Sequence, residues 1–307
     1  MGSITPSTYT RVVAIAIFAL ALIVVTGAAV RLTDSGLGCE DWPACNDEQL
    51  IPELAFHPWI EFGNRLLSGA VALAVGAAVL TAYRRTPRRA DLIRWAWGLV
   101  AGVAAQIVLG GITVRVDLHP AMVGMHFLLS MVLLWNAVLL WVRAVAGSAE
   151  STPAVDRLTL RLGQLSLGLG TAVLVAGTLV TGTGPNSGDP RAERLGFDLT
   201  EITRVHSVTV WCFAAVTLIV ILRLRSQPAT PANAVGPWLL GAIVAQGGIG
   251  YLQFALGVPP LIVAAHIVGA IVVWCMAVLF YLRLFDRPAP TPDPPVTTAE
   301  PFATMDS

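Results

Sequence analysis

Long apolar runs separated by short polar segments make up most of this chain of 307 residues. Each run is close to the roughly 20 residues that a helix needs to cross a hydrocarbon core about 30 Å thick. The runs are continuously apolar, whereas membrane barrel strands alternate between apolar and polar residues. The pattern therefore predicts eight membrane-spanning helices, at about residues 12–30, 61–82, 95–114, 121–142, 163–182, 205–222, 237–256 and 261–282.

One construction occurs twice along the chain, over residues 105–134 and 245–274. Both copies begin with Ala-Gln, and in both a proline is followed six residues later by a histidine, His126 or His266. Because each half contains an even number of spans, the two halves share one orientation in the membrane. The sequence predicts an all-α integral membrane protein of two pseudo-symmetric four-helix bundles, related by an axis along the membrane normal.

This repeat also predicts how the chain is divided. We expect an N-terminal four-helix unit over residues 1–145, a linker over 146–162 and a C-terminal four-helix unit over 163–285. The last segment, 286–307, is rich in Pro, Thr and acidic residues and is expected to be disordered.

Composition and charge agree with a membrane protein. Apolar residues make up 55% of the chain and charged residues only 12%, and the net charge of zero does not suggest a nucleic-acid partner. Arginines gather in the loops after every second predicted span, and the opposite loops are acidic or mixed. The positive-inside rule then predicts a multi-pass protein of the cell membrane with both termini in the cytoplasm. The first span is followed by no small-x-small cleavage pattern, so we expect it to be retained.

Four cysteines fall into two classes. Cys39 and Cys45 lie in the first outer loop, on the oxidising side of the membrane, where a disulfide is favoured over two free thiols. Cys212 and Cys275 lie inside apolar spans, where a thiol usually acts as a small apolar side chain.

Three histidines, His126, His206 and His266, lie inside spans near their outer ends. One such residue could serve only in packing, but three at a common depth indicate ligands that face the bundle interior. His206 and His266 come from the second and fourth helices of one unit, an arrangement that favours a six-coordinate b-type heme held between two imidazoles. A divalent metal is disfavoured because no carboxylate or thiol occurs at ligand spacing. Without a Cys-x-x-Cys-His motif, covalent heme attachment is excluded.

The N-terminal unit has His126 opposite Asn64. An amide is a poor ligand for heme iron, so a heme here is expected to be held through His126, with Asn64 at most a weak ligand. The other coordination position would then lie open beside Glu61. Burying an acid in a membrane is energetically costly, so an acid found there usually has a function.

These features together resemble the heme A synthase family over about residues 12–285. The most specific stretch is Gly-x-x-Val-Arg-Leu-Thr-x-Ser-Gly-Leu-x-Cys, residues 27–39, followed by Trp-Pro and Cys45; a second is Glu61-Phe-x-Asn64-Arg65. The resemblance implies oxidation of the C8 methyl of heme O to a formyl group, which gives heme A for terminal oxidases. In the family the acid commonly begins a Glu-x-x-His-Arg pattern, and here Asn64 stands in place of that histidine.

The resemblance also implies roles for single residues. Glu61 falls on the catalytic acid, His206 and His266 on the axial ligands of heme b, and His126 on a ligand of the substrate heme. Cys39 and Cys45 fall on the disulfide of the outer loop. The implied partners are heme O, membrane lipid, heme O synthase, cytochrome oxidase assembly factors and further copies of this chain.

Two other functions stay open on the residues alone. A non-catalytic b-type cytochrome would use His206 and His266, and a heme-handling transporter or chaperone would use outward-placed histidines. Four arginines at the outer ends could pair with heme propionates or anchor the helices at the interface: Arg31, Arg65, Arg115 and Arg204.

Overall fold

The computed structural model describes residues 3–39, 42, 44–45, 51–52, 54–147 and 151–286. Apart from Asp286, the tail predicted to be disordered lies outside these residues. The elements found within them are α1 (Pro6–Leu32), α2 (Phe56–Arg84), α3 (Ala90–Arg115), α4 (Pro120–Val145), β1 (Thr152–Pro153), α5 (Arg157–Thr183), α6 (Leu199–Leu224), α7 (Ala232–Ala255), α8 (Pro260–Leu282) and β2 (Phe285–Asp286).

All eight helices in the described part of the chain are long and apolar enough to cross a membrane. The predicted all-α membrane fold is therefore confirmed, and the protein is a multi-pass membrane protein. Several helices extend beyond their predicted spans because polar caps lengthen them. Thr5 accepts the Thr8 N–H at 3.2 Å to begin α1. Asp156 accepts the N–H groups of Leu158 and Thr159, so α5 begins at Arg157 rather than at residue 163.

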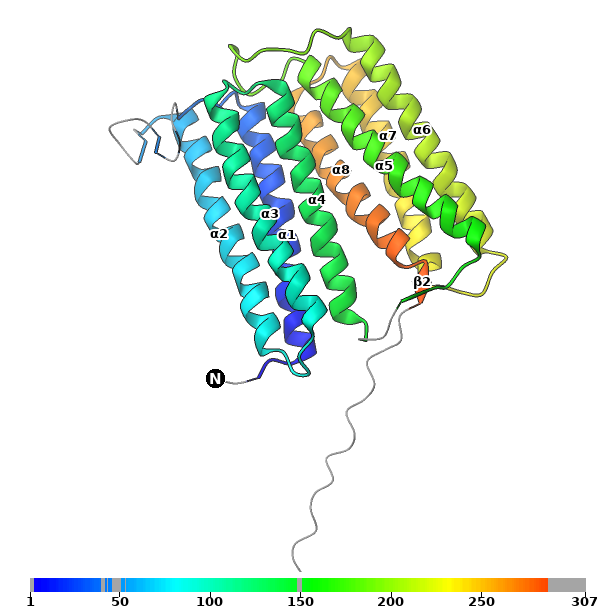
Figure 1. Ribbon diagram of the computed structural model, residues 1–307. Helices are drawn as coiled ribbons and strands as arrows, with labels where there is room; N and C mark the ends of the chain where they lie inside the picture. The colour runs from blue at the N-terminus through cyan, green and yellow to red at the C-terminus, as the bar shows by residue number, and fades with distance from the viewer. Residues whose placement is uncertain are drawn as a thin grey trace, which may run out of the picture.

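The helices pack as two rings of four, α1 to α4 and α5 to α8 (Figure 1). Within each ring, every helix contacts the next, and the first contacts the last. The rings meet where α4 packs on α8, α1 on α8 and α4 on α5. In the repeat, α1 corresponds to α5 and α4 to α8, so the contact of α1 with α8 is equivalent to the contact of α5 with α4. This arrangement is what the predicted pseudo-two-fold axis requires.

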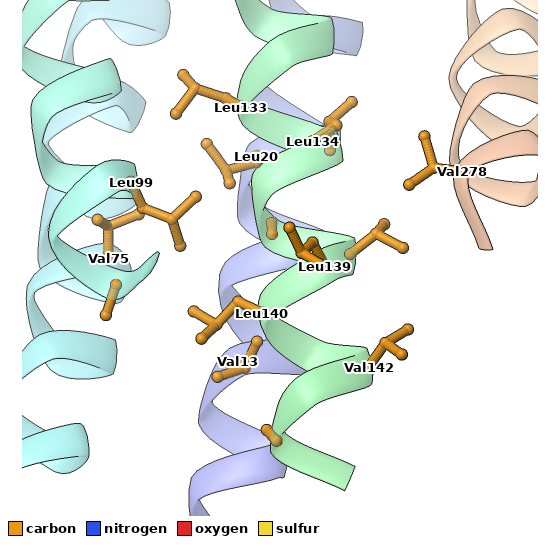
Figure 2. Close-up of a cluster of buried hydrophobic side chains, with 14 of the residues drawn as sticks. Val13, Leu20, Val75, Leu99, Leu133, Leu134, Leu139, Leu140, Val142 and Val278 are labelled. Carbon is orange, nitrogen blue, oxygen red and sulfur yellow. The ribbon is translucent and has the colours of Figure 1, made fainter. Parts of the chain in front are cut away.

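The N-terminal ring closes around apolar side chains from all four of its helices. Figure 2 shows Leu20 of α1, Val75 of α2 and Leu99 of α3 beside Leu140 of α4, and all four are at most 3% exposed. Val278 extends from α8 toward α4, so this core continues across the boundary between the rings. The two halves are therefore packed together as one body.

A hydrogen bond also crosses the boundary between the two rings. The Trp274 indole N–H on α8 donates to the main-chain carbonyl of Met131 on α4 at 2.8 Å. At the opposite end from the site described below, β1 pairs antiparallel with β2, with Thr152 opposite Asp286. The sequence did not predict these two short strands, which tie the start of the second half to the end of α8.

Candidate functional site

Four polar side chains occupy matching positions within the first three turns of α2, α4, α6 and α8, namely Asn64, His126, His206 and His266. Each lies against a glycine of the preceding helix, so close that a β-carbon on that glycine would touch it or nearly so. The pairs, with the distance from that β-carbon to the nearest side-chain atom, are Gly27–Asn64 at 3.9 Å, Gly110–His126 at 3.4 Å, Gly177–His206 at 3.3 Å and Gly250–His266 at 3.1 Å.

These glycines explain how an imidazole fits between closely packed helices. Without a side chain, the glycine lets the ring lie against the neighbouring helix backbone. The glycines were not among the site residues predicted from the sequence. The signal was present, because in both copies of the repeat a glycine follows the repeated glutamine by four residues, Gln106 to Gly110 and Gln246 to Gly250.

The repeated Gln-to-His spacing is a direct contact in the structure. The Gln106 side-chain amide donates to the main-chain carbonyl of His126 at 3.0 Å, and Gln246 donates to that of His266 at 2.6 Å. Each glutamine therefore joins the third helix of its bundle to the fourth at the level of the histidine. This contact orients the helix that carries the candidate ligand.

His206 and His266 face each other across the C-terminal bundle. Their ring centroids are 6.5 Å apart, with the ring planes at 69°. The Nδ1 atoms of both, and that of His126, are buried and have no hydrogen-bond partner among the described residues. In the same part of the chain, no group of three or more His, Cys, Asp or Glu residues could hold a metal ion. The pair of His206 and His266 therefore suits heme iron, because the porphyrin supplies the remaining ligands of the metal.

The N-terminal bundle has a different pair at the corresponding positions. His126 projects from α4, whereas Asn64 on α2 is joined to α1 through Thr26, whose hydroxyl lies 2.8 Å from the Asn64 amide oxygen. His57, which could have replaced the missing histidine, is hydrogen-bonded with Ser35 at 3.0 Å between Nδ1 and Oγ. One half therefore offers two imidazoles and the other offers one imidazole and a tethered amide.

Glu61 lies one turn before Asn64 and is 6% exposed. Its Oε2 accepts the main-chain N–H of Cys39 at 2.8 Å, and its Oε1 accepts an N–H of Arg65. Arg65 also donates to the Ala44 carbonyl at 2.9 Å. The carboxylate is thus held between its own helix and the first outer loop.

That loop is closed by the predicted disulfide between Cys39 and Cys45, which is formed. Because one partner of Glu61 lies at the disulfide and another contacts residue 44, inside the closed loop, the disulfide and the acid form one connected unit. From the sequence, Glu61 and the disulfide are two separate predictions, and the hydrogen bond from the Cys39 N–H to Glu61 is seen only in the structure.

Comparisons with known proteins show the family of this chain. The family model COX15-CtaA, described as cytochrome oxidase assembly protein, matches residues 10–185. The heme A synthase of Geobacillus kaustophilus (strain HTA426) is 36% identical over 100 residues, which is 32% of this chain and only 31% of that protein. The heme A synthase of Rhodopseudomonas palustris (strain BisB5) is 27% identical over 86% of this chain and 88% of its own.

A third relative carries another name. The protoheme IX farnesyltransferase of Thermus thermophilus is 30% identical over 87% of this chain, but the match covers 47% of that protein. The family model covers more than half of the present chain and includes Glu61, Asn64, His126 and both cysteines of the disulfide. With its paired bundles, its disulfide-closed loop and its histidines at matching depth, this chain belongs to the COX15-CtaA family of cytochrome oxidase assembly proteins.

Proposed function

We propose that this protein is a heme A synthase, which oxidises the C8 methyl of heme O to the formyl group of heme A. The observation that carries the proposal is the difference between its two halves. The C-terminal half has two facing imidazoles, which suit a stable electron carrier, and the N-terminal half has one imidazole on α4 and a buried carboxylate on α2, which suit a reactive site. The names of its relatives support the same function.

The C-terminal pair fits a b-type heme by distance. An iron atom bonded to one nitrogen of each ring at about 2 Å, the usual metal–imidazole distance, places the ring centres about 6 to 6.5 Å apart. The observed separation of His206 and His266 is 6.5 Å. The cofactor bound there would relay electrons to or from the substrate site, and the two histidines, set against Gly177 and Gly250, would hold it in place.

In the N-terminal half, His126 would bind the iron of the substrate, heme O. Asn64 is joined to Thr26 on the neighbouring helix, which keeps its amide oxygen turned toward α1. We therefore propose that this half supplies one strong axial ligand and leaves the other position open or weakly occupied.

Glu61 would handle protons and developing positive charge at the substrate methyl, which would take its oxygen from water and pass through an alcohol and a hydrated aldehyde that loses water. The net conversion of methyl and one water to the formyl group releases four protons and four electrons, and an electron acceptor outside this chain would take the electrons. A carboxylate acts strongly on nearby charge when water is excluded, and Glu61 is buried. Arg65 holds one of its oxygens and the Cys39 N–H the other. The residue is thus positioned before substrate arrives, which lowers the cost of reorganisation.

The division of the chain follows from these sites. We propose residues 1–145 as the substrate unit, 163–285 as the heme b unit and 146–162 as their link, with both termini in the cytoplasm of a cell that makes heme O. A heme O synthase would supply the substrate, and cytochrome oxidase assembly factors would receive the product.

A complementation experiment tests the proposed function. A bacterial strain that lacks its own heme A synthase and keeps its heme O synthase would be given this chain. We expect its membranes to regain the absorption band of a heme A oxidase. If this chain reaches the membrane as a folded heme protein and the band does not return, the electron-carrier or heme-handling function is favoured.

Gly250→Ala should weaken the heme b site. The new methyl would lie 3.1 Å from a His266 ring carbon, so the ring must shift by a few tenths of an ångström from the position that faces His206. We expect the purified variant to lose most of its low-spin heme absorbance. Gly247→Ala on the same helix meets nothing within 4 Å and should keep the wild-type spectrum. Equal spectra for the two variants would contradict the assigned role of Gly250.

Asn64→His should convert the N-terminal site to a second two-imidazole site. Gly27 faces residue 64 in the same way that other glycines face the three histidines, so there is room for the new ring. With heme bound in both halves, wild type is expected to show one low-spin and one high-spin signal by electron paramagnetic resonance, and Asn64→His two low-spin signals. Asn64→Ala, the control, should keep the high-spin signal. Two low-spin signals in wild type would show that a second strong ligand is already present.

A further inference from the structure

Of the four arginines near the outer ends of the helices, three are already engaged. Arg65 binds Glu61 and the Ala44 carbonyl. Arg204 pairs with Glu201 at 3.0 Å, and both side chains are at least 70% exposed. Arg115 reaches across the surface to the carbonyl of Trp42 at 3.3 Å. These three do not require a further anion.

Arg31 differs from the others. It is half-buried, and its Nη2 donates to the main-chain carbonyl of Thr181 at 3.1 Å. Its side chain packs along Gly188, where an added β-carbon would lie 3.5 Å from the Arg31 Cγ. Among the described residues it forms no ion pair with an acid. Instead Arg194, a second cation, interacts with it electrostatically. A half-buried guanidinium beside a second cation and without a negative partner is unfavourable, so this position favours an anion.

The position of Arg31 in the repeat tells which anion is available. Gly27 and Gly177 are equivalent, because each faces the site residue of the next helix. Arg31 and Thr181 each follow those glycines by four residues, one helical turn farther toward the outer end. The hydrogen bond from Arg31 to Thr181 therefore joins two equivalent positions across the pseudo-two-fold axis. The guanidinium is thus bonded one helical turn beyond Gly177, which faces His206, and its own residue lies one turn beyond Gly27, which faces Asn64.

We infer that Arg31 binds a heme propionate at the junction of the two halves. This inference rests on the proposed function, because it requires a heme in at least one bundle. A guanidinium has five N–H donors in a planar fork that matches a carboxylate, and the bond to Thr181 uses one of them. The carboxylate would belong either to the substrate heme of the N-terminal bundle or to heme b of the C-terminal bundle, because the guanidinium joins α1 to α5.

The test compares Arg31→Gln and Arg31→Lys with wild type and with Arg204→Gln, the exposed control. Two quantities are measured on the purified full-length protein: the midpoint potential of the low-spin heme and the dissociation constant for added heme O. Loss of a hydrogen-bonded charge should weaken heme binding by about ten- to a hundredfold in the affected site. It should also lower the heme potential, because a nearby cation favours the reduced form. Arg31→Lys should give a smaller change.

The two sources of the carboxylate give separate results. A lower potential with unchanged heme O affinity assigns the propionate to heme b, and weaker heme O binding with an unchanged potential assigns it to the substrate. If both quantities in Arg31→Gln and Arg31→Lys match Arg204→Gln, the inference is wrong and Arg31 only joins the helices. A wild-type protein that binds no heme would instead overturn the proposed function itself.

Discussion

Glu61→Gln is expected to abolish the conversion of heme O while leaving the C-terminal heme spectrum unchanged. Glutamine keeps an oxygen that can accept the Cys39 N–H, which Glu61 now accepts at 2.8 Å, so the outer loop should stay in place. It cannot carry a proton or a negative charge. Removing a positioned acid–base group typically slows a reaction by about 10²- to 10⁴-fold. Product formation would be followed by chromatography of extracted hemes.

Glu201→Gln is the matched control for that experiment. Glu201 lies near the start of α6, at the same end of the bundle, but it is 71% exposed and pairs with Arg204. Its replacement should leave activity at the wild-type level. Turnover of heme O by Glu61→Gln at a wild-type rate would exclude the role assigned to Glu61, whereas loss of activity in both variants would point to a general effect of charge at the outer surface.

His266→Ala is expected to remove the low-spin heme of the C-terminal bundle and, with it, the activity. The two imidazoles face each other with their ring centroids 6.5 Å apart, so the substitution removes one of the two ligands of this site. A single imidazole, that of His206, would hold heme weakly and in a high-spin state. The measurement is the heme content and spectrum of purified protein, with correct folding checked by its elution volume.

His119→Gln is the control for the loss of a histidine. His119 lies between α3 and α4, its side chain is 46% exposed, and its Nε2 lies 3.7 Å from a carboxylate oxygen of Glu193. This variant should retain its heme. A His266→Ala protein with an unchanged low-spin signal would show that the heme b site lies elsewhere.

Much of this architecture could be predicted because two signals are unusually direct in membrane proteins. Apolar runs of sufficient length mark spans, and the repeated spacing from Gln106 to His126 and from Gln246 to His266 reveals the duplication. Histidines inside an apolar span also stand out, because placing them there is costly. The helix ends were harder to predict, since hydropathy does not detect polar caps such as Thr5 and Asp156.

The contacts that build the site could not be predicted from one sequence. Nothing in the spacing shows that the Cys39 N–H meets Glu61, because the two come together only when the outer loop folds back over α2. The link from Thr26 to Asn64 joins different helices, and so does the close approach of Gly250 to His266. Each depends on how the helices are rotated and spaced, which side-chain packing decides.

The central claim is that this protein oxidises heme O, and the most direct measurement is the chemical identity of the hemes it makes. The chain would be expressed in a host that makes heme O and no heme A, and extracted hemes would be identified by liquid chromatography and mass spectrometry. We expect heme A or hydroxylated heme O, absent from the Glu61→Gln control. If only heme B and unchanged heme O are recovered from a folded protein with an intact low-spin spectrum, the claim is contradicted.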